Sequence, residues 1–273
     1  MGKVVAIVNH KGGVGKSTTT MNLGIGMVKA GKKVLLVDAD PQSSLTISMG
    51  IRNSECLEYT LVSLMQSVME NRPPLTNHGI IHLTGGVDLL PTNIELSGIE
   101  LRLFVAKNRK RILRNCLDEI CCNYDYILID CPPSLGMMTI NALVAADSII
   151  IPAEPEYLAV KGLNLLMHYV VKARTGINPG LQIEGILFTM VRSKMNNASD
   201  IIVSMEKTLG ERICIFSTRI PYSVRVSEAA QDGKSIYSCR DSGTVAKAYE
   251  SLTKEVIELA QRNKHRSRID GVR

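Results

Sequence analysis

The sequence has no tryptophan and only three phenylalanines, so a folded core must be built from aliphatic side chains. No apolar run reaches the ~18 residues that a membrane-spanning helix needs. The N-terminus also shows no apolar signal stretch followed by a cleavage site. These absences favour a cytoplasmic protein, and we expect no membrane partner. Hydrophobic residues make up 45% of the chain, which argues against intrinsic disorder.

Paired cysteines are also missing. The seven cysteines include no C-x-x-C pair, and their number is odd. A structural metal site would need paired ligands, and a disulfide framework is typical of small secreted chains. We therefore interpret the cysteines as buried or incidental thiols in a reducing compartment.

Acidic residues are scarce at the C-terminal end. The formal net charge is +6, from 32 basic and 26 acidic residues. The last twelve residues, 262–273, contain five basic residues and one acidic residue, so the body carries only about +2. Such an end suits contact with an anionic polymer, and it is equally compatible with a solvated, frayed tail. We divide the chain into a domain at 1–262 and a basic tail at 263–273.

Short apolar runs alternate with longer segments of helical periodicity. The predicted strands are Lys3–Val8, Val34–Val37, Val87–Leu90, Tyr126–Ile129, Ser148–Ile151, Ile183–Phe188 and Ile213–Phe216. The predicted helices are Ser17–Ala30, Ile94–Cys122, Met137–Ala146, Leu158–Thr175, Ser199–Leu209 and Val245–Gln261. Buried strands that alternate with helices predict a single α/β domain, in which a mostly parallel twisted sheet carries helices on both faces. The segment Arg52–Gly86 is the least regular, and we expect an insertion or a mobile loop region there.

A glycine-rich string lies between the first predicted strand and the first predicted helix. It reads Lys11-Gly12-Gly13-Val14-Gly15-Lys16-Ser17-Thr18. Glycines leave backbone N–H groups free to converge on phosphate oxygens, and the helix N-terminus adds its positive dipole. Lys16 can reach the β- and γ-phosphates, and Ser17 can offer its hydroxyl to Mg²⁺. The strict P-loop pattern has a glycine where His10 stands, so that pattern is not met. The alternative to a phosphate-binding loop is a plain glycine-rich turn, but such a turn would not demand Lys16.

Carboxylates follow two of the predicted strands. Asp38 and Asp40 come after Val34–Val37, and Asp130 comes after Tyr126–Ile129. In parallel α/β sheets, ligands bind beyond the carboxyl ends of the strands. An aspartate there is well placed to hold Mg²⁺ through water, and equally to orient an attacking water. Turn or helix capping is the alternative, but beside a phosphate loop we favour the functional interpretation.

These motifs resemble the deviant Walker A ATPases, in which two lysines bracket the glycines, and among them the ParA/Soj partitioning proteins. The resemblance extends from Lys3 to about Ala260 and covers nearly the whole chain. Four further segments are similar to that family: Asp38–Gln42, Leu89–Leu96, Pro152–Leu163, and Ile220-Pro221 followed by Val224–Ala229. The resemblance implies an ATPase with ATP and Mg²⁺ as cofactors, whose slow hydrolysis is stimulated by a partner.

The resemblance also implies a role for each site residue. In a sandwich of two subunits and two ATP molecules, Lys11 would reach across to the partner's phosphates, Lys16 would hold phosphate, and Asp40 would position the attacking water. The metal would be held by Ser17, Asp38 and Asp130, possibly through water. The implied nucleotide-binding set is Lys11, Gly12, Gly13, Val14, Gly15, Lys16, Ser17, Thr18, Thr189, Met190 and Pro221.

The role that the resemblance implies is DNA partitioning. An ATP-bound homodimer would bind double-stranded DNA without sequence preference, and a ParB-like centromere-binding protein would stimulate hydrolysis and release. The protein would then be cytoplasmic, and associated with the nucleoid when it is bound to ATP. The DNA-binding candidates are Arg192, Lys194, Arg219 and Arg225. The chain departs from the family where I-P-R-N is replaced by Ile220-Pro221-Tyr222-Ser223, which leaves the DNA contacts and the base pocket open.

Three rivals remain. A MinD-like membrane-cycling ATPase would need a C-terminal amphipathic helix, whereas the segment after Ala260 is polar and basic. An iron–sulfur carrier of the same superfamily would need a C-x-x-C pair to share a cluster. A non-enzymatic DNA-binding switch would not need the full set of Lys16, Asp40 and Asp130. The sequence does not identify the replicon that is served, or the partner.

Overall fold

The computed structural model describes residues 2–72, 79–156, 159–192, 213–239 and 243–270. Within these ranges, seven strands form one sheet in the order β3-β4-β2-β5-β1-β6-β7. The strands are β1 (Lys3–Ile7), β2 (Val34–Asp38), β3 (Ile81–His82), β4 (Val87–Leu90), β5 (Tyr126–Asp130), β6 (Ser148–Ala153) and β7 (Gln182–Phe188). All neighbouring pairs are parallel except β3 with β4, which confirms the predicted mostly parallel sheet.

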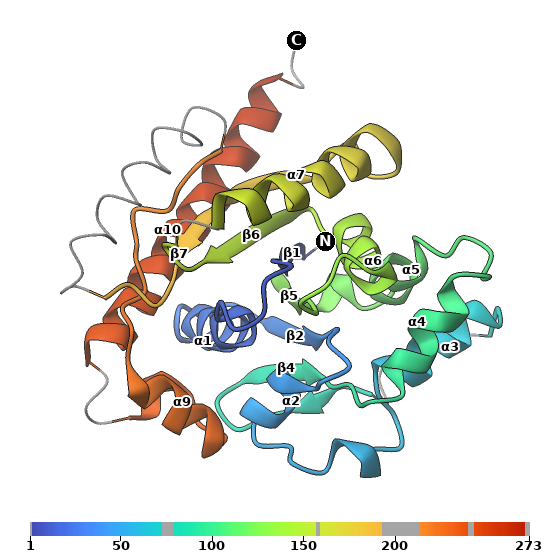
Figure 1. Cartoon of the computed structure of the whole chain (residues 1–273), viewed down its shortest axis with the longest axis horizontal. Helices are drawn as coiled ribbons and strands as arrows, with labels where there is room; N and C mark the ends of the chain where they lie inside the picture. Colours follow the sequence, from blue (N-terminus) through green and yellow to red (C-terminus); the bar gives the residue numbers. More distant parts are fainter. Residues whose placement is uncertain (1, 73–78, 157–158, 193–212, 240–242, 271–273) are drawn as a thin grey trace.

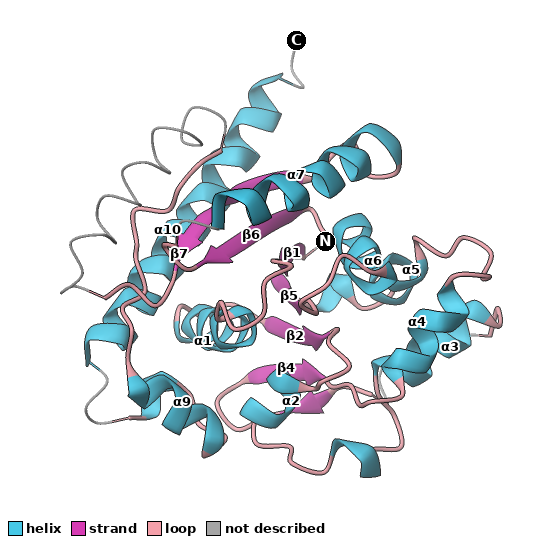
Figure 2. Ribbon diagram, in the orientation of Figure 1, coloured by secondary structure: helices cyan, strands magenta, loops and turns pink. Residues whose placement is uncertain are grey.

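Helices cover both faces of this sheet (Figures 1 and 2). They are α1 (Lys16–Lys29), α2 (Ser44–Ser48), α3 (Leu61–Met69), α4 (Leu96–Leu103), α5 (Ile112–Asp118), α6 (Met137–Ala145), α7 (Ala159–Gly176), α9 (Val224–Gln231) and α10 (Gly243–Asp270). Short 3-10 turns lie at Ser54–Cys56, Cys121–Asn123 and Ile236–Ser238.

Alternation along each strand divides the core into two layers. In β1, Val4 and Ala6 join the cluster that packs under α3 to α7, whereas Val5 and Ile7 join the cluster under α1 and α10. Successive side chains of a strand point to opposite faces, so a continuous apolar run is needed when both faces are covered. The apolar strands in the sequence therefore reflect a sheet buried on both sides.

Two predicted elements were wrong. The single helix expected over Ile94–Cys122 is divided into α4 and α5, because the run of lysine and arginine at 107–111 offers no apolar side chain to bury. The strand expected at Ile213–Phe216 is reduced to an isolated parallel bridge between Ile186 and Ile215.

Two other segments also differ from expectation. The region Arg52–Gly86 is more regular than predicted: it contains α3, which begins in a capping box formed by Thr60 and Ser63, and also β3. The last helix is longer than predicted, since α10 extends to Asp270. The boundary at 262 therefore stays a prediction, and the helix predicted at Ser199–Leu209 lies outside the described residues.

Candidate functional site

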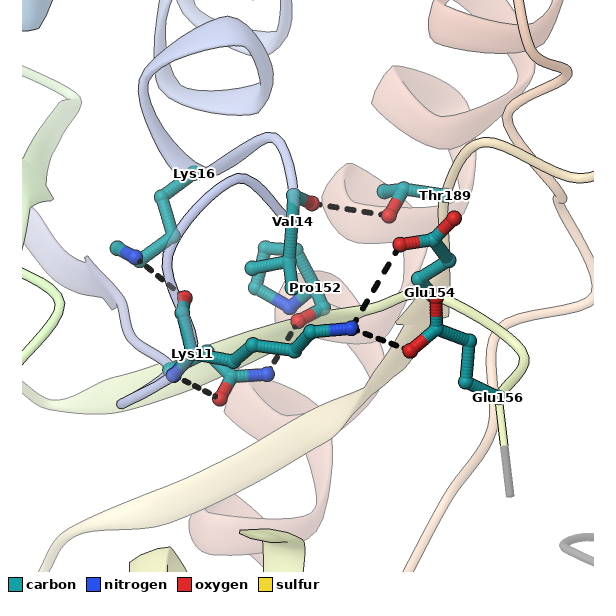
Figure 3. Close-up of polar contacts among 8 residues, drawn as sticks. Lys11, Val14, Lys16, Pro152, Glu154, Glu156 and Thr189 are labelled. Atoms are coloured by element: carbon teal, nitrogen blue, oxygen red, sulfur yellow. Dashed lines mark hydrogen bonds and ion pairs between the residues drawn. The ribbon is translucent and has the colours of Figure 1, made fainter. Parts of the chain in front are cut away.

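The glycine-rich loop turns tightly from the end of β1 into α1. Gly13 and Gly15 adopt positive φ angles of 72° and 82°, a region that side chains with a Cβ rarely enter. Gly15 caps α1, which begins at Lys16. The Lys16 side chain folds back over the loop, and its Nζ donates to the Lys11 carbonyl at 3.0 Å (Figure 3). The loop therefore encircles a cation, as a phosphate cradle requires.

Hydrogen bonds to residues at the ends of β6 and β7 hold the loop in place (Figure 3). The Thr189 hydroxyl donates to the Val14 carbonyl at 2.9 Å, and the Asn9 amide donates to the Pro152 carbonyl at 2.7 Å. The Asn9 side-chain oxygen in turn accepts from the Lys11 backbone N–H at 3.0 Å. The loop is thus preorganised by hydrogen bonds to its own sheet, which limits the ordering that ligand binding would require.

The predicted carboxylates meet at the carboxyl end of the sheet. Asp38 and Asp130 are the last residues of the adjacent strands β2 and β5, and they are paired directly in the strand register. Both are fully buried. The Asp38 Oδ2 accepts from the Thr46 N–H at 2.8 Å and from the Thr46 hydroxyl at 2.7 Å. The Asp130 Oδ1 accepts from Thr20 at 3.4 Å, whereas its Oδ2 is buried without a hydrogen-bond partner among the described residues.

Burial and mutual repulsion perturb these groups. Burial raises the pKa of Asp38 to about 6, although the hydrogen bonds from Thr46 oppose the rise. Burial and the charge of Asp38 raise the pKa of Asp130 well above its ordinary value, while Ser17 and Lys16 act in the opposite direction. Burial lowers the pKa of Lys16, although Asp130 nearby favours its charged form. A divalent cation would relieve this repulsion between the carboxylates.

These residues fit a magnesium ion that is only partly held by protein. Among the described residues, no group of three or more histidine, cysteine, aspartate or glutamate side chains forms a complete metal site. Mg²⁺ usually takes one or two carboxylates and completes its shell with phosphate oxygens and water. Such a cation would give the unpartnered, buried Asp130 Oδ2 a partner. Asp40 lies beside this pair and is nearly buried, and its Oδ1 accepts from the Gln42 N–H at 2.9 Å.

The second lysine of the loop pairs within its own chain. The Lys11 Nζ lies 2.5 Å from Glu156 Oε2 and 3.7 Å from Glu154 Oε2 (Figure 3). This hydrogen bond lowers the pKa of Glu156. Both glutamates follow the end of β6, so the segment Pro152–Leu163 supplies the counterions of Lys11. The sequence analysis quoted this segment only as a family likeness and missed its contact with the loop.

A cavity of ≈ 330 Å³ opens beside the loop. The predicted residues Thr189, Met190 and Pro221 line it, together with Gly15 and Thr18 of the loop and α1. Its remaining lining is Ile220, Tyr222, Ser223, Val226, Ser227, Ala230, Gln231 and Tyr249. Sequence reasoning did not assign this second group to the cavity, because it comes from residues 220–223, α9 and α10, which are far from the loop along the chain. The cavity has the size and mixed polarity of a site for a planar base.

Two of the predicted DNA-binding residues, Arg192 and Arg225, lie near the same region and are not free cations. The Arg192 guanidinium lies 4.3 Å from the centroid of the Tyr222 ring. The Arg225 NH1 donates to Glu228 Oε2 at 2.9 Å, which is the i,i+3 pair of an exposed helix face. Arg219 is exposed, and Lys194 lies outside the described residues. The structure therefore brings Arg192 against Tyr222, which lines the cavity, and places Arg225 in α9, whose residues Val226 and Ser227 also line it.

The sequence is similar to a known domain family and to several characterised proteins. The AAA domain family matches residues 2–183. The sporulation initiation inhibitor protein Soj of Bacillus subtilis is 41% identical over 263 residues, covering 94% of this chain and 98% of Soj. The chromosome-partitioning ATPase Soj of Treponema pallidum is 37% identical and covers 94% and 98%. The chain belongs to the Soj/ParA family of partitioning ATPases.

Solved structures agree with this membership. Cobyrinic acid a,c-diamide synthase from Mycobacterium smegmatis, with bound ADP and magnesium, has a TM-score of 0.79 at 28% identity, covering 96% of each chain. The complex of Cyanothece McdA with ATP has a TM-score of 0.81 at 25% identity and covers 93% of this chain and 96% of McdA. In the described part of this Soj/ParA protein, no helix is both long enough and apolar enough to cross a bilayer.

Proposed function

We propose that this protein is an ATP-dependent DNA-partitioning ATPase whose nucleotide state controls assembly and DNA binding. The observation that carries the proposal is the meeting of Lys16, Asp38, Asp40 and Asp130 around a preorganised glycine loop at the carboxyl end of the sheet. Relatives crystallised with ADP or ATP support the same ligands here, namely ATP and Mg²⁺.

Each group would then have one task in the reaction. Lys16 and the loop N–H groups hold the phosphates, and the adjacent cavity takes the base. Ser17, Asp38 and Asp130 would hold the metal, directly or through water, and the metal would neutralise charge on the phosphates. Asp40 accepts a hydrogen bond from the attacking water and orients it toward the γ-phosphate. The slow, partner-stimulated hydrolysis that the family resemblance implies is part of this proposal.

Dimerisation would complete the site. Lys11 sits at the mouth of the loop with its charge directed away from its own cradle, toward Glu154 and Glu156. In a sandwich dimer it leaves these glutamates and neutralises the phosphates bound by the second subunit, as an arginine finger does. The dimer doubles the number of phosphate contacts with duplex DNA, and affinity rises steeply with that number through counterion release. A ParB-like protein would be the partner that triggers hydrolysis and release.

The test is a mobility-shift titration against salt with duplex DNA of unrelated sequences, in ATP and in ADP. We expect binding in ATP to exceed binding in ADP by at least about tenfold at equal salt, because two linked sites replace one. Asp40→Ala is expected to retain ATP, to accumulate as a dimer and to stay on DNA. Lys16→Ala removes the cation that holds the ATP phosphates, so this variant serves as the control that does not bind ATP. Equal DNA affinity in the two nucleotides would contradict the proposed switch, whereas an Asp40→Ala variant that hydrolyses ATP at the parent rate would make Asp40 a turn cap.

A further inference from the structure

The last turn of α4 and the segment that joins it to α5 together expose three large apolar side chains. Leu101 is 72% exposed, Phe104 54% and Val105 89%. Leu101 and Val105 are the most exposed of the large hydrophobic residues that the structure describes. Scattered exposed apolar residues need no explanation, but three within five positions form a patch.

The same segment carries a concentrated positive charge. Residues 101–117 contain no aspartate or glutamate, and they contain six basic residues, which equals the formal net charge of the whole chain. The six are Arg102, Lys107, Arg109, Lys110, Arg111 and Arg114. Arg102 pairs with Glu70, and Arg114 lies near Asp118. Lys107, Lys110 and Arg111 are exposed and have no ion pair among the described residues. We call Leu101–Arg111 the α4–α5 patch.

The patch is held in one conformation rather than left as a loose end. The Arg109 guanidinium donates to the Phe104 carbonyl at 2.6 Å, and the Asn141 amide of α6 donates to the Arg109 carbonyl at 2.8 Å. Asn108 takes a positive φ of 56°, which asparagine tolerates better than most residues. Buried Leu103 and Ile112 anchor the two ends. These hydrogen bonds and buried anchors hold the backbone of the patch in place while its apolar side chains stay exposed to solvent.

The patch projects at the right-hand edge of the molecule in Figure 1, on the opposite side from α9 and α10. It is thus separate from the cavity, and from Arg192 and Arg225 near it. A second copy of this chain is a poor occupant, because a two-fold contact would bring the like charges together. Duplex DNA would satisfy the cations but offers no place for three apolar side chains. A partner that accepts both the cations and the apolar side chains must carry negative charge above an apolar layer.

We propose that the α4–α5 patch binds an anionic lipid bilayer surface. Leu101, Phe104 and Val105 enter the boundary between headgroups and acyl chains, and the cations around them pair with anionic headgroups. Long lysine and arginine side chains can keep their charges at headgroup level while their stems lie against apolar groups. This inference departs from the expectation of no membrane partner, and it does not depend on the proposed DNA binding. It also differs from the membrane-cycling rival, which would use a C-terminal helix.

The experiment is vesicle flotation of the full-length protein, with and without ATP and Mg²⁺. Vesicles of phosphatidylcholine alone are compared with vesicles that also contain phosphatidylglycerol. We expect flotation only with phosphatidylglycerol. We also expect a loss of roughly tenfold or more in Lys107→Glu with Lys110→Glu, since each basic residue near the surface contributes a severalfold factor. Leu101→Ser with Val105→Ser is expected to lose flotation as well, because the apolar contacts are removed. Neither pair touches the core, so circular dichroism should stay unchanged.

A matched control uses the other exposed apolar face, with Val171→Ser and Lys172→Glu on α7, and should float like the parent. ATPase rate and duplex affinity are measured for every variant and should not change. Equal flotation with both vesicle types, or none with either, would overturn the proposal. If the parent never floats and the variant Lys107→Glu with Lys110→Glu loses duplex affinity, the patch is a DNA contact instead. A failure of the partitioning function would be seen separately, as DNA affinity that does not respond to ATP in the parent.

Discussion

At the scale of single residues, the site depends on two carboxyl groups that repel each other. Asp38 and Asp130 end adjacent strands, and neither has a lysine or arginine in hydrogen-bond contact. Thr46 stabilises ionised Asp38 with two donors, whereas Asp130 keeps one oxygen unpartnered. The nucleotide-free protein therefore stores an unfavourable interaction that a bound cation relieves.

The raised pKa of Asp38, about 6 against an ordinary 3.8, gives a prediction about pH. A carboxyl whose pKa is higher in the folded state binds its proton more tightly there, so its ionisation destabilises the fold. The melting temperature of the nucleotide-free parent, taken relative to Asp38→Asn, should fall as pH rises from about 4 to 6 and level off above. Mg²⁺-dependent ATP binding should weaken over the same interval as pH falls, because the protonated carboxyl is a poor ligand. Parallel melting curves for the two proteins across this interval would exclude the assignment.

At the scale of elements, the phosphate loop rests on α7. A Cβ added to Gly162 would lie 2.3 Å from the His10 Cε1, so α7 approaches the loop more closely than any side chain permits. The ordinary P-loop has a glycine where His10 stands, and the histidine ring occupies the space that Gly162 leaves. His10 and Gly162 therefore form one packing contact between the loop and α7.

We predict that Gly162→Ala weakens ATP binding severalfold and lowers stability by about 1–3 kcal/mol, because the His10 ring must move and displace the loop. Alanine would otherwise favour a helix by about 0.5–1 kcal/mol over glycine. Gly98→Ala in α4 is the matched control, since its added Cβ meets nothing within 4 Å. It should stabilise the protein slightly and leave ATP affinity alone. Calorimetric titration and thermal melts decide the question, and an equal gain in stability in both variants would rule out the contact as a constraint on the loop.

At the scale of the whole molecule, the pair of Lys11 with Glu156 would oppose the proposed assembly. Lys11 is needed across the proposed dimer interface, so its bonds to Glu156 and Glu154 have to break first. Exposed ion pairs contribute about 0.2–1 kcal/mol. We therefore predict that Glu156→Gln strengthens ATP-dependent dimerisation by up to about fivefold, measured by sedimentation equilibrium.

Two companion variants make this prediction specific. Lys11→Ala should bind ATP within about threefold of the parent yet fail to dimerise, because Lys16 rather than Lys11 holds its own nucleotide. Glu58→Gln removes an exposed carboxylate elsewhere and should leave dimerisation unchanged. A normal ATP-induced dimer in Lys11→Ala would contradict the role across the interface, and weaker dimerisation in Glu156→Gln would show that Glu156 supports assembly.

The sequence by itself determined the sheet, the loop and the strand-end carboxylates, because each is encoded in residues adjacent along the chain. Neighbouring residues alone are enough to recognise an apolar run of strand length, the glycines before Gly15-Lys16-Ser17, or an aspartate after a buried strand. Where periodicity was interrupted without a glycine or proline, as between α4 and α5, local reasoning joined two helices into one. The capping box at Thr60 gave no such local signal, since Ser63 stands where the usual pattern has glutamate or glutamine.

Only the tertiary structure decided which distant residues complete the site. Thr46 and Asp38 are eight residues apart, Lys11 and Glu156 are 145 apart, and no periodic signal relates either pair. The cavity beside the loop draws on α9 and α10, and the α4–α5 patch becomes visible only when the exposure of each side chain is known. Contacts of this kind are set by how the layers pack around the sheet, and packing is a property of the whole chain rather than of any segment.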